Sequence, residues 1–141
     1  MEGSSIQVGE VFYLPLGRNE RIEPGEGYST RNKYLIVLGF SPEGDVICGA
    51  VFNSRINQKL PLEIQQYHYP IDYRKYSFLS HQSFVDCSSL IPVSRNKFRA
   101  DSRCGQIDEE DLGYVLEAVV EAPTTRMAEL VYFGLLPGAD D

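Results

Sequence analysis

Two cationic side chains, Arg31 and Lys33, stand where a long polar segment ends and an apolar run begins. The segment from Gly17 to Asn32 contains three glycines and a proline without sustained periodicity, which predicts a loop. Long loops in compact domains are often functional. One interpretation is that the two cations bind a phosphate group at the end of this loop, and the alternative is that they form a solvated loop end.

The two histidines suggest different roles. An imidazole gains and loses a proton near neutral pH, so His81, just before an apolar segment, could act as a general acid or base. A surface or packed histidine is the alternative. His68 stands between Tyr67 and Tyr69, and strand alternation places it on the face opposite both rings, so we interpret it as structural.

Cys87 follows Asp86 and lies six residues after His81, which would suit a cysteine nucleophile. Strand alternation points Asp86 and Cys87 to opposite faces, which disfavours such a pair. The three cysteines are odd in number and lack C-x-x-C spacing, so the sequence predicts neither a disulfide framework nor a zinc site. No other residues suggest a metal or a cofactor.

An aromatic stretch from Tyr67 to Tyr76 contains Arg74 and Lys75. Rings next to cations can stack the bases of a single-stranded nucleic acid. Tyrosine is also an ordinary strand residue, so a core or dimer-interface role is the alternative.

The apolar segments predict a strand-rich domain. Residues 8–14 suit a first strand that ends at Pro15, and residues 34–40 and 46–52 form a buried hairpin around a turn with proline and glycine. Residues 53–82 would supply an extra strand and a lid, and residues 83–93 one or two short strands.

The periodicity changes after Gly105. Asp108 is placed to cap a helix, the acidic residues that follow favour its positive end, and apolar residues recur on one face: Leu112, Val115, Leu116, Val119 and Val120. A second helix is predicted from Thr125 to Pro137-Gly138, with Met127, Leu130, Val131 and Leu135 facing inward. We therefore predict one α+β domain over residues 1–141, mainly β, with a helical part at 105–141.

Composition limits the classes of function. The chain has 141 residues and neither an apolar run long enough for a membrane span nor a signal-peptide pattern at its start, so we expect it in the cytoplasm. The net charge is −7, but residues 1–103 hold 12 of the 13 basic and 11 of the 20 acidic residues, leaving +1 there and −8 in residues 104–141. This balance disfavours indiscriminate duplex binding and allows a local basic groove.

Several segments in order resemble the MazF/PemK toxin family. They are Gly9-Glu10-Val11-Phe12, Lys33 to Leu38, Gly49 to Ser54, Ser83 to Leu90, and Gly105-Gln106-Ile107 before the helix. The resemblance covers most of residues 8–122. It implies a small SH3-like barrel, a homodimer, cleavage of single-stranded RNA without a metal or other cofactor, and a regulatory antitoxin partner.

The resemblance also assigns positions. The family's arginine before the second strand falls on Lys33, its threonine after the third strand on Asn53 with Ser54 beside it, and its Arg-x-Asp pair on Asp86 and Ser88. An amide at Asn53 can bind a phosphate oxygen but cannot act as a general acid.

Two hypotheses follow. The first is a growth-inhibiting toxin or defence effector, an endoribonuclease in which Arg31 or Lys33 binds the phosphate. In it, Asn53 and Ser54 orient the phosphate, and His81 or Asp86 assists proton transfer. The second is a barrel that has lost catalysis and binds a protein or a nucleic acid through the same groove, and the altered residues at positions 53, 86 and 88 favour it.

Overall fold

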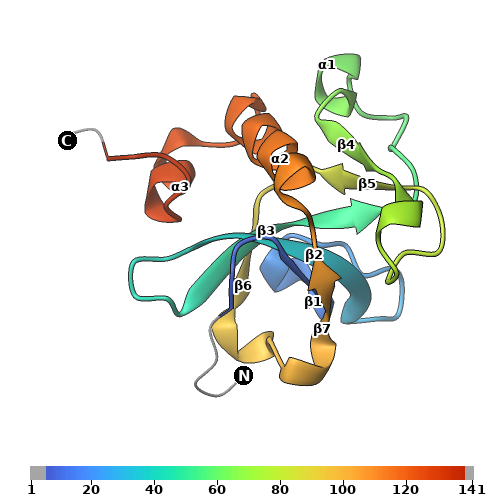
Figure 1. Ribbon diagram of the computed structural model, residues 1–141, viewed down its shortest axis with the longest axis horizontal. Coiled ribbons are helices and arrows are strands. Elements are labelled where there is room, and N and C mark those ends of the chain that lie inside the picture. The colour runs from blue at the N-terminus through green and yellow to red at the C-terminus, as the bar shows by residue number, and fades with distance from the viewer. Residues whose placement is uncertain (1–5, 139–141) are drawn as a thin grey trace.

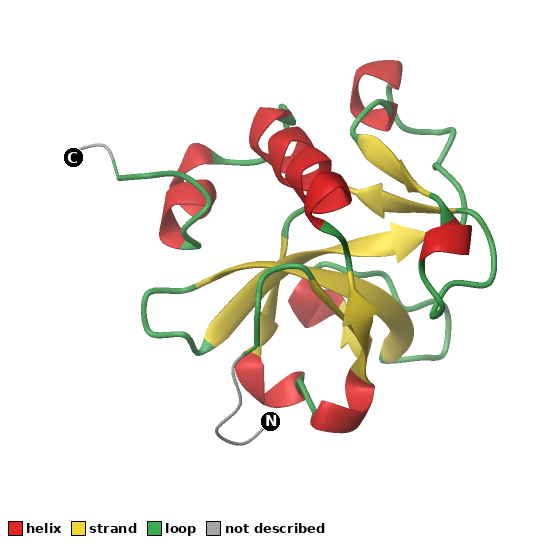
Figure 2. Cartoon of the chain, in the orientation of Figure 1, coloured by secondary structure: helices red, strands yellow, loops and turns green. Residues whose placement is uncertain are grey.

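The computed structural model describes residues 6–138, in which an antiparallel sheet carries two helices along one side (Figures 1 and 2). The strands are β1 (Glu10–Gly17), β2 (Thr30–Phe40), β3 (Val46–Asn53), β4 (His68–Ile71), β5 (Ser83–Asp86), β6 (Ile91–Ser94) and β7 (Arg103–Gln106). The α-helices are α1 (Leu62–Gln65), α2 (Glu109–Glu121) and α3 (Met127–Tyr132). Short 3-10 turns are η1 (Arg18–Glu20), η2 (Tyr73–Lys75), η3 (Arg95–Lys97) and η4 (Ala100–Ser102). The predicted class, mainly β with C-terminal helices, is confirmed.

The strand order is β4-β5-β3-β2-β1-β7, with β6 attached to β3. Strand β3 divides the sheet, because Val46 to Gly49 pair with β6 whereas Phe52 and Asn53 pair with β5. Within the described residues, neither β4 nor β6 pairs with β7, so the hydrogen bonding of the bent sheet does not close into a ring.

Both faces of the central strands are buried. One face holds Phe12, Leu14, Leu16, Leu35, Val37, Ile47, Val51, Ile91, Val93 and Phe98. The residues between them, such as Val11, Ile36 and Leu38, face the other way and pack with α2 and α3. Burial on both sides explains why residues 34–40 are a continuous apolar run rather than an alternating one.

Helix α2 forms as the sequence predicts. The Asp108 carboxylate accepts a hydrogen bond of 2.8 Å from the Asp111 backbone N–H, which caps the first turn. Val115 and Val119 are fully buried, and Leu112 and Leu116 pack on the same core.

Helix α3 differs from its prediction. It ends at Tyr132 because Gly134 takes a left-handed backbone (φ 82), and Leu135 N–H and Gly134 N–H donate to the carbonyls of Leu130 and Val131. This is the hydrogen-bond pattern of a Schellman cap. The predicted inward position of Met127 is wrong, since its side chain stands at the first residue of the helix and is 70% exposed.

Strands β1 and β2 also begin or end at other residues than predicted. Strand β1 continues through Pro15 to Gly17, and β2 begins at Thr30, so Arg31 and Lys33 lie on a strand rather than in a loop. Strand β7 was not predicted. Its residues are mostly polar, and it forms because its backbone pairs with Glu10 to Phe12 of β1.

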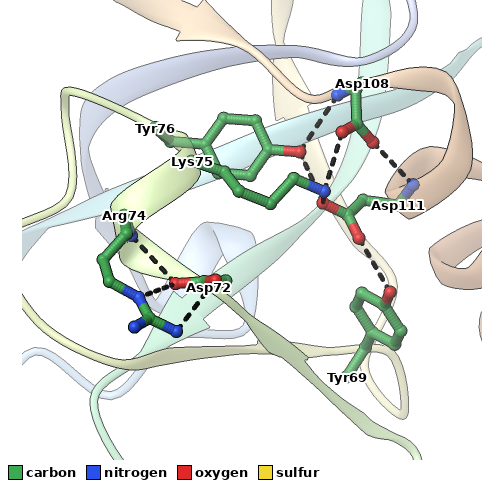
Figure 3. A network of polar contacts seen from close by, with 7 residues as sticks. All are labelled: Tyr69, Asp72, Arg74, Lys75, Tyr76, Asp108 and Asp111. Carbon is green, nitrogen blue, oxygen red and sulfur yellow. Dashed lines mark hydrogen bonds and ion pairs between the residues drawn. The ribbon is translucent and has the colours of Figure 1, made fainter.

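A buried carboxylate attaches α2 to the aromatic stretch (Figure 3). Asp111 is 6% exposed and accepts hydrogen bonds from the hydroxyls of Tyr69 (2.8 Å) and Tyr76 (2.5 Å). Lys75 Nζ lies 3.0 Å from Asp111 and 2.8 Å from Asp108. Burial, and then the bond to Asp111, raise the pKa of both tyrosines. Asp111 therefore has a structural role beyond compensating the helix dipole.

Replacing Asp111 with alanine should lower the free energy of unfolding by about 1–3 kcal/mol, because two shielded hydroxyls lose their acceptor. Urea denaturation would measure this. The neighbouring Glu110→Ala is the matched control, and we expect it to change stability by less than about 0.5 kcal/mol because Glu110 is exposed. Equal effects of the two substitutions would contradict the role given to the buried network.

Candidate nucleic-acid site

A pocket of about 370 Å³ opens where the start of β2, the end of β3 and the β4–β5 pair meet. Its polar lining includes Arg31, Lys33, Asn53, Arg55, His68 and Asp86.

Strand register explains how residues distant in sequence reach this pocket. Leu35 of β2 pairs with Val51 of β3, so the same antiparallel register continued by two residues sets Lys33 opposite Asn53. Asn53 in turn pairs with Phe84 of β5. In the last pair, His68 of β4 lies directly opposite Asp86 of β5.

Lys33 and Asn53 form the inner part of the site. The Lys33 ammonium donates a short hydrogen bond to Asn53 Oδ1. Because an ammonium only donates, its partner must be the amide oxygen, and the Asn53 Nδ2 group remains free to donate to a ligand. Burial, reinforced by the nearby Arg31 charge, lowers the pKa of Lys33.

Asp86 is held by one of its two oxygens. Oδ1 accepts hydrogen bonds from the Ser88 N–H (3.0 Å) and Ser88 hydroxyl (2.6 Å) and lies 3.3 Å from His68 Nε2. The structure gives Oδ2 no partner, and no buried side-chain polar atom among residues 6–138 lacks one, so Oδ2 reaches solvent. The carboxylate is therefore fixed in place with one oxygen available.

His68 is buried at 5% exposure, and its other ring nitrogen, Nδ1, lies 3.1 Å from the Gln65 carbonyl. Both ring nitrogens are thus engaged inside the protein. The arrangement lets His68 orient Asp86 rather than contact a ligand itself.

The outer part of the pocket is mainly cationic, and Glu23, which also lines the pocket, is paired with Arg18 at 2.7 Å. The side chains of Arg31 and Arg55 are exposed and make no hydrogen bond or ion pair with any residue of the described part of the chain. Arg21 also lines the pocket, but it is paired with Glu129 at 2.7 Å and donates to the Leu90 carbonyl. Two free guanidinium groups beside a lysine and an amide donor suit the oxygens of a phosphate.

The pocket contains four of the six predicted site residues: Arg31, Lys33, Asn53 and Asp86. Ser54 and His81 are exposed and do not line it, and His81 instead has Ser80 Oγ at 3.4 Å from its Nδ1. Arg55 is not among the predicted site residues. The structural role predicted for His68 agrees with its burial, but its position beside Asp86 was not predicted. Alternation from Asn53 could have indicated Arg55, whereas His68 depends on a pairing between residues 68 and 86 that no local pattern predicts.

The structure gives less support to a cysteine nucleophile or a metal site. Burial raises the pKa of the Cys87 thiol to about 12, which opposes a thiolate nucleophile. Among residues 6–138, no three His, Cys, Asp or Glu side chains gather in a geometry that could hold a metal ion. No helix in that range is long and apolar enough to cross a membrane.

No protein-family model matches the chain, and no curated protein matches it in sequence. A chain in the crystal structure of MazE-MazF (Form-III) from Deinococcus radiodurans is similar in structure, with a TM-score of 0.55 and 11% sequence identity. The alignment covers 82% of this protein and 94% of that chain. The fold is MazF-like. At so low an identity the MazF-like fold indicates architecture alone, and arguments about function must come from the pocket.

Replacing Arg31 with alanine should raise the pKa of Lys33, because a neighbouring positive charge disfavours the ammonium form. NMR titration of lysines labelled at Cε would follow this change. Arg74→Ala is the matched control, since Arg74 is exposed and paired with Asp72, and neither residue lines the pocket. If Lys33 has the same pKa in both variants as in the original protein, the electrostatic coupling between Arg31 and Lys33 is contradicted.

Proposed function

We propose that this protein is a toxin or defence effector of the MazF/PemK type that cleaves single-stranded RNA without a metal ion. One observation supports the proposal most strongly. Two arginines without protein partners, Arg31 and Arg55, border a pocket in which a fixed carboxylate and a lysine of lowered pKa face the same space. This arrangement offers phosphate binding, a proton acceptor and a proton donor together.

In the proposed reaction, the free oxygen of Asp86 accepts the proton of the ribose 2′-hydroxyl. The 2′-oxygen then bonds to the adjacent phosphorus, and the bond from phosphorus to the 5′-oxygen breaks. Lys33 gives a proton to that leaving oxygen, so the products are a 2′,3′-cyclic phosphate and a 5′-hydroxyl. The guanidinium groups and Asn53 Nδ2 stabilise the negative charge that develops on the phosphoryl oxygens.

The surroundings suit these roles. Lys33 is half-buried, and a lowered pKa makes an ammonium a better proton donor near neutral pH. His68 is a positioning residue in this proposal, since its Nε2 lies 3.3 Å from Asp86 Oδ1 and leaves Oδ2 without a protein partner. Ser54 and His81 have no part in this version of the mechanism, because both lie outside the pocket lining.

The proposal extends to assembly and regulation. We propose a homodimer, and an antitoxin that blocks the pocket until it is removed, since the similar Deinococcus radiodurans structure is of MazE with MazF. Released activity would arrest bacterial growth. We propose that the protein acts in the cytoplasm, where messenger RNA is available.

A binding module is the second candidate, and the Asn53 amide favours it. Lys33 is hydrogen-bonded to that amide, and Asp86 accepts hydrogen bonds from Ser88 and lies 3.3 Å from His68 Nε2, so these polar groups have partners without a substrate. Such a pocket could hold a phosphate without cutting the strand.

Removing both free guanidinium groups, with Arg31→Ala and Arg55→Ala together, should weaken binding of a single-stranded RNA oligonucleotide. The slope of log affinity against log salt should fall by about 1.4, because two phosphate contacts are lost. Fluorescence anisotropy at several salt concentrations would measure both. The melting temperature should be unchanged, since neither side chain has a protein partner.

The matched control is Arg74→Ala with Arg99→Ala, which removes the same charge from two exposed arginines that do not line the pocket. We expect the control variant to keep the original salt slope. Equal losses in the two double variants would mean that net charge, and not this pocket, determines binding.

Asp86→Asn should reduce cleavage by about 10²–10⁴-fold while RNA binding stays near the original level, because the amide cannot accept the hydroxyl proton. Gel assays of cleavage and anisotropy of an uncleavable 2′-O-methyl strand would separate the two properties. Asp101→Asn, an exposed position outside the pocket, is the control. An original protein that binds the strand but neither cleaves RNA nor arrests growth would establish the binding module instead.

A further inference from the structure

Tyr28 presents a bare aromatic ring to solvent. Its side chain is 72% exposed, the highest value for any ring in the described part of the chain. Three of the other four exposed tyrosines pack on a second ring: Tyr13 on Tyr34, Tyr114 on Tyr69 and Tyr132 on Phe133. No ring within residues 6–138 contacts Tyr28, so its faces are open to a ligand.

The backbone presents this ring on a turn. Tyr28 N–H donates to the Gly25 carbonyl at 3.3 Å, and Gly25 and Gly27 both take positive φ values (97 and 86). A Cβ placed on either glycine would meet nothing within 4 Å, so the space around the turn is empty. Pro24, just before the turn, is buried and anchors it.

The ring borders a second hollow of about 460 Å³, lined by Pro24, Tyr28, Thr30, Arg31 and Asn32. Arg31 lines this hollow and the phosphate pocket alike. The two spaces are therefore neighbours that share Arg31, whose guanidinium group has no protein partner within residues 6–138.

We infer that the hollow beside Tyr28 is a nucleobase subsite, which takes the base of a nucleotide adjoining the phosphate held by Arg31. The base stacks on the Tyr28 ring, and Thr30 and Asn32 offer polar groups to its edge. An exposed aromatic face next to a phosphate-binding cation is how proteins hold single-stranded nucleic acids. This inference rests on the proposed function, because it needs an RNA strand in the first pocket.

The absence of tryptophan from the chain makes a direct test available. In Tyr28→Trp, all tryptophan fluorescence comes from position 28, and a stacked base should quench it. The probe is an uncleavable 2′-O-methyl oligonucleotide, compared with the same backbone carrying abasic sites. We expect quenching by the first strand and little by the second. Tyr114→Trp, on α2 and outside both hollows, should show no quenching with either strand.

Affinity gives a second readout. Tyr28→Ala should bind the complete strand about tenfold more weakly and the abasic strand as well as the original protein does. Tyr114→Ala should leave both affinities unchanged, and circular dichroism would confirm that each variant is folded.

The outcomes separate this inference from the proposed function. Suppose that the original protein binds the strand, while the fluorescence of the Tyr28→Trp variant is not quenched or is quenched equally by the abasic strand. The base subsite is then wrong and the phosphate pocket stands. If the original protein binds no RNA at all, the proposed function and the subsite are both overturned.

Discussion

The change of partner along one side of β3 is the constraint on which the rest of the structure depends. The first half of β3 pairs with β6, and its last two residues pair with β5. Neither strand could continue along β3 without displacing the other, so the sheet must divide at this point. The division sends β4 and β5 away from β6 and leaves Asn53, His68 and Asp86 around the resulting opening. On its other side β3 packs tightly against β2, since a Cβ at Gly49 would lie 2.4 Å from the Ile36 carbonyl oxygen.

The positive charge of the pocket depends less on the overall composition than on which cations have carboxylate partners. The protein is acidic overall, yet many of its cations are neutralised locally: Arg18 by Glu23, Arg21 by Glu129, Lys75 by Asp108 and Asp111, and Lys97 by Glu20. Arg31 and Arg55 have no such partner in the described part of the chain. A net charge of −7 is thus compatible with a local positive site, because nearby unpaired charges dominate at contact distance and distant ones are screened.

The sequence predicted correctly those features that depend on interactions between residues close together in the chain. The hairpin of β2 and β3, the Asp108 cap and the buried face of α2 follow from turn residues, capping and helical periodicity, all within a few residues of one another. The pairing of His68 with Asp86 joins positions far apart in the chain through two short strands, and β7 is formed by backbone pairing with β1 despite its polar residues. Ser54 and His81 were predicted as site residues from their positions in the sequence. Whether a side chain reaches the pocket depends instead on where the sheet divides.

The proline within β1 has a consequence for the behaviour of the protein in concentrated solution. Strand β7 pairs with β1 only as far as Phe12, and within residues 6–138 no strand pairs with the rest of β1 on that side. An open edge invites a strand from another molecule to add to it and start aggregation. Pro15 has no N–H to offer such a strand, and its carbonyl is already taken by Lys97 Nζ at 2.8 Å. Pro15 and the η3 residue Lys97 thereby oppose intermolecular β-pairing at this short stretch.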